Sequence, residues 1–333
     1  MEGRDEVSFS AGIIGTGMAL PEKIVTNADL EKIVDTTDKW IVSRTGIRQR
    51  TIAQEHESTS TFAVQAGRDA LEAAGVAPGE IDLLICATVT PDSPLPAVSC
   101  TIQAELGAAN AAAFDISAAC TGFIYALTIA DNFIKNGAAE NVLVIGAEVL
   151  SKWVDWTDRA TCVIFADGAG AAVVSRVPEG SGILSSMIRS DGNFANVLNI
   201  PAGGTKEPFS QEVLDNKRHY IKMRGNELFK VAVRAMAYTS KQVLKEAGYS
   251  PDDVDLVIPH QANKRITDAV AERINITDDR MYENIDRIGN SSSATIPIGL
   301  HENVASGRLK KGDLVLLTAF GGGVTWGSLL MRW

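Results

Sequence analysis

The stretch AGVAPGEIDLLI at residues 74–85 recurs as AGYSPDDVDLVI at residues 247–258, which is 173 positions later. Six of the twelve positions are identical. A second pair has nearly the same spacing, because NVLVIGAE at 141–148 aligns with DLVLLTAF at 313–320, 172 positions later. Chance recurrence of a common helix–glycine–strand pattern would explain one such pair, but two pairs in the same order favour an internal duplication.

Each repeated block predicts a buried strand, because it is a continuous apolar run bounded by glycine or aspartate. In both halves the first block follows an amphipathic segment that ends in glycine, Gly75 or Gly248, the residue that most often terminates a helix. The pattern predicts an α/β protein made from a duplicated α/β half. We place the two halves at residues 1–178 and 179–333.

Between its repeated strands each half carries one more predicted strand, AAFDI at 112–116 and MYENI at 281–285. A helix follows each of them and begins near Cys120 in the first half and near Ser291 in the second. These two residues align at an offset of 171. Two such halves would bring equivalent strand ends together at one cleft.

The helix over residues 120–136 should be buried where the halves meet, because apolar side chains occur on nearly all of its sides. These side chains are Phe123, Ile124, Leu127, Ile129, Phe133 and Ile134.

Composition narrows the class of protein. A chain of 333 residues suits two fused units of roughly 150 residues each. The net charge of −10 argues against a nucleic-acid-binding protein, which usually carries a basic face. Four cysteines without C-x-x-C spacing argue against zinc sites and disulfide frameworks. The polar start MEGRDEVSFS and the lack of a membrane-length apolar run predict a cytoplasmic protein with no signal peptide and no membrane contact.

Cys120 within DISAACTGF is the first candidate for chemistry. A predicted strand ends just before it and a helix begins beside it, so the thiol meets unpaired N–H groups and the positive end of the helix dipole, which favour thiolate. Small neighbours leave room for a substrate carbonyl. A buried structural cysteine is the alternative.

His260 and Asn290 are the other candidates. His260 follows Pro259 at the end of a second-half strand in DLVIPHQANKR, and a single histidine in such a place is either structural or functional. Asn290 in DRIGNSSSATIP lies one residue before the position aligned with Cys120, and its alternative role is a helix N-cap.

Two glycine-rich stretches differ in what they predict. In AFGGGVTWG at 319–327, three consecutive glycines after a strand let backbone N–H groups approach a ligand closely, although a flexible turn would also explain them. GIIGTG at 12–17 resembles a dinucleotide fingerprint, but Pro21 interrupts the helix that should follow it. We therefore do not expect nicotinamide binding.

Taken together, these residues resemble the β-ketoacyl-acyl carrier protein synthase III family of the thiolase superfamily, from about residue 11 to residue 333. Order and spacing agree throughout the matching segments, which are NADLEKIVDTTDKWIVSRTGIR, DISAACTGF, DWTDRAT, DGAGAAV, GNELFKVAV, PHQANKRI, GNSSSATIP and FGGGVTWGS.

The resemblance implies a thiolase-like, five-layered αβαβα fold, a homodimer and a catalytic triad of Cys120, His260 and Asn290. The Cys120 thiolate would attack an acyl-CoA primer and expel CoA, while the backbone N–H groups of Cys120 and Gly322 hold the oxyanion. His260 and Asn290 would stabilise the enolate formed when malonyl-acyl carrier protein loses CO₂. The acyl group would then move to that carbanion, with no metal or redox cofactor, and the product would initiate fatty acid synthesis.

The resemblance also assigns binding residues. Those for CoA are Thr36, Trp40, Arg44, Arg159, Asn226 and Asn263, with Trp40 and Arg159 enclosing the adenine. Those for acyl carrier protein are Lys230, Lys264 and Arg265, which a solvated helix face would also explain. Those for the acyl pocket are Leu95, Leu150, Phe165 and Phe320. The family often has an aromatic residue where this chain has Leu95, which reaches into the partner subunit's pocket, so the primer could be larger than acetyl.

Three other functions fit parts of the pattern. A starter condensing enzyme or acyltransferase of polyketide or quinolone synthesis can have the same triad. A papain-like hydrolase also has Cys, His and Asn in this order, but the signature C-G-[SA]-C-[WY] is absent. A non-catalytic scaffold would not need these residues and three glycines at neighbouring strand ends.

Overall fold

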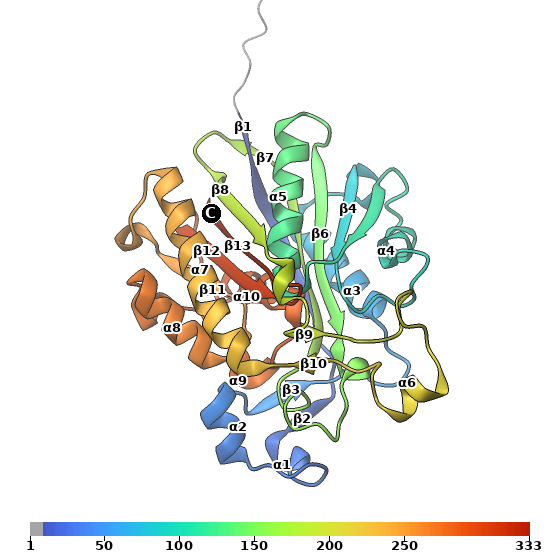
Figure 1. The fold of residues 1–333 in the computed structure, drawn as a ribbon. Coiled ribbons are helices and arrows are strands. Elements are labelled where there is room, and N and C mark those ends of the chain that lie inside the picture. Colours follow the sequence, from blue (N-terminus) through green and yellow to red (C-terminus); the bar gives the residue numbers. More distant parts are fainter. Residues whose placement is uncertain (1–8) are drawn as a thin grey trace, which may run out of the picture.

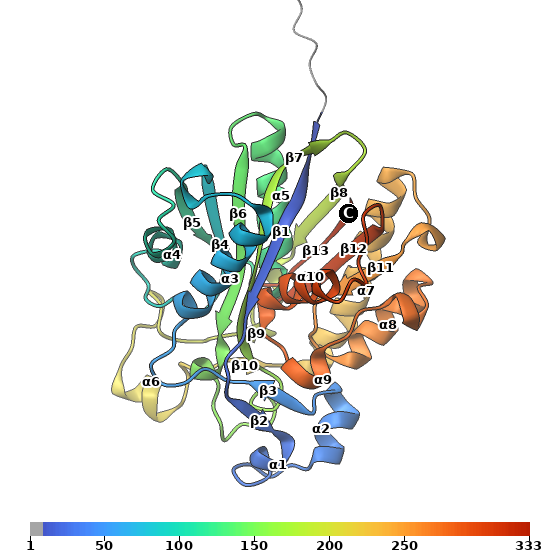
Figure 2. The ribbon, with the colours of Figure 1, turned by 180° about the vertical axis from the view of Figure 1, so that it is seen from behind.

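Two β-sheets pack on either side of a pair of buried helices in the computed structural model, which describes residues 9–333 apart from the side chain of residue 226 (Figures 1 and 2). The first sheet has the strand order β1-β7-β6-β4-β5 and the second has the order β11-β12-β13-β8. The strands of the first sheet are β1 (Phe9–Ala19), β4 (Leu83–Ala87), β5 (Ala112–Ile116), β6 (Asn141–Val149) and β7 (Asp167–Pro178). Those of the second are β8 (Gly182–Ser190), β11 (Leu256–Pro259), β12 (Leu314–Gly321) and β13 (Thr325–Arg332).

Helices fill the space between the sheets and cover both outer faces. α5 and α10 lie between the sheets, α3 and α4 cover the first sheet, and α7 and α8 cover the second (Figures 1 and 2). The predicted αβαβα order of five layers is therefore confirmed. Their bounds are α3 (Thr59–Ala74), α4 (Val98–Leu106), α5 (Gly122–Lys135), α7 (Gly225–Ala247), α8 (Lys264–Ile274) and α10 (Thr295–Ala305).

Shorter elements lie near the carboxyl ends of the central strands. They are β2 (Ile24–Thr26), α1 (Asn27–Leu30), α2 (Asp38–Thr45), β3 (Gln49–Thr51), β9 (Leu198–Asn199), α6 (Gln211–Asp215), β10 (Lys222–Met223) and α9 (Ile285–Ile288). The chain changes sheets between the end of β7 at Pro178 and the start of β8 at Gly182. This supports, as our proposal, a division of the halves at residue 178.

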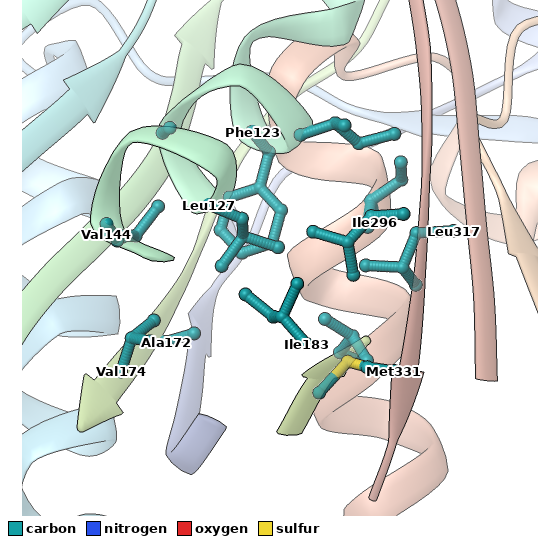
Figure 3. Packing of buried hydrophobic residues seen from close by; sticks show 14 of the residues in the cluster. Phe123, Leu127, Val144, Ala172, Val174, Ile183, Ile296, Leu317 and Met331 are labelled. Carbon is teal, nitrogen blue, oxygen red and sulfur yellow. The ribbon is translucent and has the colours of Figure 1, made fainter. Parts of the chain in front are cut away.

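The central helix α5 is buried along one stripe. Phe123 and Leu127 point into the space between the sheets, toward Leu317 of the second sheet (Figure 3). Burial of each such side chain stabilises the fold by roughly 1.5–3 kcal/mol. Phe133 was expected inside but is 38% exposed, because it lies off the i, i+3, i+4 stripe that faces the sheets.

The second half lacks one predicted strand. MYENI at 281–285 forms a single bridge, between Met281 and Val257, in place of the strand that β5 provides in the first half. The backbone N–H of Asn284 donates to the Gln261 side chain rather than to a neighbouring strand, and the chain then enters α9. The prediction of a strand here was wrong.

The duplication is visible in backbone detail. Ala119 has φ 47° and Ser292 has φ 51°, and each begins a short 3₁₀ turn that leads into a central helix. The offset is 173 at this point, so the structural counterpart of Cys120 is Ser293. The alignment of Cys120 with Ser291 was wrong by two residues, because the loops before the turns differ in length.

Candidate active site

Three of the predicted residues meet at one cavity of about 510 Å³. Cys120 lies in the turn between β5 and α5, and His260 directly follows β11. Asn290 follows α9, and its backbone pairs with residues 164 and 166 before β7. Because these chain ends lie at the same edge of the two sheets, a duplicated fold brings a thiol, an imidazole and an amide together.

Cys120 is buried, and its surroundings disfavour the thiolate. Burial raises the pKa of the thiol to about 12, although hydrogen bonds from the Ser292 hydroxyl and from the N–H groups of Cys120 and Gly322 act in the opposite direction. The sequence argument from the helix N-terminus predicted a stabilised thiolate, whereas the pKa of the thiol is raised. It did not include desolvation, which is larger here.

His260 is only 1% exposed and is neutral. Its Nδ1 lies 2.7 Å from the Thr295 hydroxyl, which in turn lies 3.0 Å from the carbonyl oxygen of Ser292. Burial lowers the pKa of the imidazole to about 3. A neutral ring at this position can donate or accept a hydrogen bond but is a poor base.

This burial predicts an acid-dependent loss of stability. Between the ordinary pKa of 6.5 and the folded value of about 3, the unfolded chain binds a proton at His260 and the folded chain does not, so stability falls as pH falls. Relative to His260→Gln, the wild type should lose about 2 kcal/mol more between pH 7 and pH 5, measured by urea unfolding. Parallel pH curves for the two proteins would contradict the buried neutral ring.

Asn290 presents its amide nitrogen to the cavity. Its Oδ1 accepts the N–H of Ser292 at 2.9 Å, a cap-like bond that fixes the side chain. Its Nδ2 makes no hydrogen bond with any residue in the described part of the chain. The capping role and the functional role suggested by the sequence are thus compatible.

The glycine loop lies against the thiol. A side chain at Gly321 would place its Cβ 2.6 Å from the backbone nitrogen of Cys120, so only glycine fits there. The next N–H, that of Gly322, hydrogen-bonds to the Cys120 sulfur. These contacts place two backbone N–H groups beside one sulfur, an arrangement that can hold an oxyanion.

Most of the predicted CoA residues lie at the mouth of this cavity. The Arg159 guanidinium lies 4.7 Å from the centre of the Trp40 ring, and Arg44 also lines the cavity. Asn263 lines it too, but its amide caps α8 and donates to the carbonyl of Arg44. Thr36 does not line the cavity, and its hydroxyl is buried. The side chain of Asn226 lies outside the described residues.

The three basic residues have different surroundings. Lys230 and Arg265 are exposed at the rim of the cavity, and the Arg265 guanidinium lies 5.6 Å from the centre of the Phe229 ring. Lys264 is bound to Glu283 at 2.6 Å and to Asp268 at 3.0 Å. Its positive charge is therefore largely neutralised within the chain.

A second cavity of about 320 Å³ adjoins Cys120 and is mostly apolar. Of the residues expected at the acyl pocket, Leu150 and Phe165 line this cavity, whereas Phe320 lines the larger one. Leu95 is 85% exposed and lines neither cavity. Sequence reasoning missed four apolar residues of this lining, which are Val89, Leu198, Ile200 and Ile221.

The sequence reasoning also missed two polar residues near the thiol, Glu148 and Ser292. Glu148 is 1% exposed and its carboxylate accepts the Ser292 hydroxyl at 3.0 Å. The available signal was the single acidic residue inside the apolar strand NVLVIGAEVL, since a charged side chain in such a run is buried with partners or has a function.

The five-layered fold with Cys, His and Asn at adjoining strand ends defines a thiolase-like condensing enzyme. The family model described as 3-oxoacyl-[acyl-carrier-protein (ACP)] synthase III matches residues 114–192. The model for the C-terminal part of the same family matches residues 244–333. The β-ketoacyl-[acyl-carrier-protein] synthase III of Caldanaerobacter subterraneus is 52% identical, over 98% of each chain.

Solved structures agree. The crystal structure of 3-oxoacyl-[acyl-carrier-protein] synthase III from Aquifex aeolicus has 52% identity and a TM-score of 0.90, over 98% of this chain and all of that one. The crystal structure of the priming β-ketosynthase from the R1128 polyketide pathway has 32% identity and a TM-score of 0.91. The match covers 100% of this chain and 98% of that one. The chain belongs to the β-ketoacyl-acyl carrier protein synthase III family, as its sequence motifs predict, and is an acyl-transferring condensing enzyme. Among the described residues, no helix is long and apolar enough to cross a membrane.

Proposed function

We propose that this chain condenses an acyl-CoA primer with malonyl-acyl carrier protein and so initiates fatty acid synthesis. The observation that carries the proposal is the meeting of Cys120, His260 and Asn290 at one cavity, beside the N–H group of Gly322. Identity of 52% to synthases of this name, against 32% to a polyketide priming enzyme, supports the fatty acid reaction over the alternative starter reaction.

The first half-reaction loads the acyl group. The Cys120 thiol gives up its proton to a base at the site as its sulfur attacks the thioester carbonyl, and the N–H groups of Cys120 and Gly322 stabilise the negative oxygen of the tetrahedral intermediate. Collapse of that intermediate expels CoA as a thiolate, which takes a proton from solvent. The acyl chain then occupies the cavity lined by Leu150 and Phe165.

The second half-reaction extends the chain. Asn290 Nδ2 and His260 Nε2 donate to the thioester oxygen of the malonyl group, which stabilises the enolate as CO₂ leaves. For Nε2 to donate, Nδ1 must accept, so the Thr295 hydroxyl turns its hydrogen from the Ser292 carbonyl to the ring. The carbanion attacks the acyl carbonyl, and the Cys120 thiolate leaves.

Access from solvent runs past Trp40 and Arg159, which stack on the adenine of CoA, while Asn263 lines the pantetheine path. Acyl carrier protein docks on Lys230 and Arg265 at the rim, and Lys264 contributes less because it is ion-paired. We also propose a homodimer. The strand β5 pairs with β4 on one side only, which leaves an edge for a second copy, and the exposed Leu95 then reaches the partner's acyl pocket.

The carrier-protein surface gives a prediction with an internal comparison. Arg265→Ala should raise the KM for malonyl-acyl carrier protein about tenfold at low salt, and less at about 0.5 M salt because exposed charges are screened. Lys264→Ala should have a smaller effect, since two carboxylates already bind that ammonium group. Steady-state kinetics at two salt concentrations measure this. Equal effects of the two variants, or no dependence on salt, would contradict this assignment.

Product analysis tests the proposed function. Acyl-CoA and malonyl-acyl carrier protein, incubated with the protein, should yield β-ketoacyl-acyl carrier protein, detected by the mass of the intact carrier. Acyl transfer to another nucleophile without chain extension would instead support a starter acyltransferase.

A further inference from the structure

A buried carboxylate that the proposed mechanism does not use lies behind Cys120. Glu148 is 1% exposed and lies near the end of β6. Its Oε2 accepts the hydroxyl of Thr88 at 3.2 Å, the N–H of Val89 at 3.1 Å and the hydroxyl of Thr90 at 2.7 Å. All three donors come from the first half of the chain, and this oxygen is fully occupied.

The other oxygen of Glu148 faces the catalytic turn of the second half. Oε1 accepts the hydroxyls of Ser292 and Ser293, each at 3.0 Å. Ser292 lies at φ 51°, a left-handed conformation that a serine rarely adopts, and it lines the same cavity as Cys120. In this conformation its hydroxyl donates its one hydrogen to the Glu148 carboxylate, and its oxygen, on the wall of the cavity that Cys120 also lines, can accept the S–H of the thiol.

The hydrogen bonds around Oε1 can accommodate either protonation state of Glu148. The Ser293 hydroxyl lies 2.8 Å from the carbonyl oxygen of Ala87 and 3.0 Å from Glu148, yet it has one hydrogen. With Glu148 ionised, that hydrogen can serve the carboxylate. With Glu148 protonated, Glu148 can donate to Ser293 while Ser293 donates to Ala87.

Cys120 needs a proton acceptor, and the imidazole of His260, which lines the same cavity, is a poor one. The thiol pKa is raised to about 12 and the pKa of His260 is lowered to about 3, both by burial. Burial raises the pKa of Glu148, which makes its carboxylate a stronger base than an ordinary one. The hydroxyl that Glu148 binds, that of Ser292, belongs to a residue that lines the same cavity as Cys120, so it can connect the carboxylate to the thiol.

On the basis of the proposed function, we propose that Cys120, Ser292 and Glu148 form a proton relay in which Ser292 takes the thiol proton and passes its own proton to Glu148. As the S–H bond of Cys120 breaks, the bond from sulfur to the acyl carbonyl carbon forms, and the C–S bond to CoA then breaks. Glu148 holds the proton while the enzyme is acylated. When the condensation expels the Cys120 thiolate, the proton returns along the same path.

The test measures the rate of acyl transfer to Cys120 in single turnovers from about pH 6 to about pH 9, by intact mass, for wild type, Glu148→Gln and Ser292→Ala. We expect each variant to load about 100-fold more slowly at pH 7. The deficit should shrink about tenfold per pH unit, because hydroxide replaces the missing acceptor. Ser292→Ala should keep the backbone, since Ala119 has a similar φ in the matching turn.

A purely electrostatic role and a purely structural role of Glu148 each predict a different result. If Glu148 acts only through its charge, which raises the thiol pKa, Glu148→Gln should load as fast as wild type or faster at pH 7. If it acts only by holding the fold together, loading should be slow at every pH, with no recovery at high pH. Either result would overturn the relay. The double variant should be no slower than the slower single variant, and additive losses would also contradict it.

Four other ionisable groups lie near Glu148 and Cys120. Burial raises the pKa of Cys86 on β4 well above its usual value and lowers that of His260. The carboxylate of Asp115 accepts the N–H groups of Val98 and Ser99, and that of Asp92 accepts the N–H of Ser60.

A matched control removes a hydroxyl from the other side of Glu148. Thr88→Val loses a hydrogen bond to Oε2 but leaves the path to Cys120 intact, so its loading rate should stay within about threefold of wild type at every pH. Alkylation of Cys120 by iodoacetamide gives an independent readout, because it requires the same proton removal. If wild type acquires no acyl group, the proposed function fails, and the alkylation profiles still decide whether the relay exists.

Discussion

Replacing Cys120 by serine should reduce acyl transfer by at least about 10³-fold, because the hydroxyl is a far weaker nucleophile than the thiol at the same position. The oxyanion contacts stay in place, since they come from the backbone of residues 120 and 322. Rapid mixing with acyl-CoA followed by intact mass measures the loss.

The matched control is Cys100→Ser, which changes an exposed cysteine on α4. That variant should load at the wild-type rate. An acyl group that still forms on Cys120→Ser protein, and maps to another residue, would show that Cys120 is not the nucleophile.

Replacement of His260 or Asn290 by alanine should separate the two half-reactions. Each variant loses one donor to the enolate oxygen, which corresponds to roughly 3–4 kcal/mol, or a fall of about 10²–10³-fold in the condensation rate. Loading should fall less than about tenfold, because the oxyanion of that step is held by backbone N–H groups. Release of CO₂ from malonyl-acyl carrier protein and the single-turnover loading rate are measured side by side.

His56→Ala is the control for histidine loss in general, because His56 is exposed, and it should leave both steps unchanged. Equal losses of loading and condensation in the His260 and Asn290 variants would mean that these side chains maintain the cavity rather than stabilise the enolate.

Much of the fold could be predicted from sequence because the duplication repeats the buried strands. The blocks at 74–85 and 247–258 end inside β4 and β11, whose apolar residues are buried on both faces and so form an uninterrupted run. The strand expected at 281–285 did not form, because the N–H of Asn284 donates to the side chain of Gln261 rather than to a neighbouring strand. A short run of apolar residues at the edge of a sheet can pair with a strand on one side only, so its hydrophobic pattern alone does not determine whether it forms a strand.

The candidate site could be predicted as far as its strand-end residues. Cys120 and His260 stand out because each follows the end of a strand, β5 or β11. Asn290 stands out because it lies close to the position that aligns with Cys120 in the second half. Local reasoning about the helix N-terminus could not supply the thiol pKa, since desolvation depends on what the other half packs over the sulfur.

Glu148 and Ser292 were missed for a related reason. They are 144 residues apart, and their hydrogen bond exists only once the second half has packed on the first. A sequence pattern indicates that Glu148 needs partners, but only the assembled fold shows which ones.

The most direct test of the proposed function is the mass of the protein after incubation with a panel of acyl-CoAs, from acetyl to branched and medium chains. We predict an acyl adduct that maps to Cys120 and disappears when malonyl-acyl carrier protein is added, with the best-loaded chain larger than acetyl. If no acyl-CoA gives an adduct on the protein, or if malonyl-acyl carrier protein does not discharge the adduct, the assignment of Cys120 as the nucleophile of a condensing reaction is contradicted.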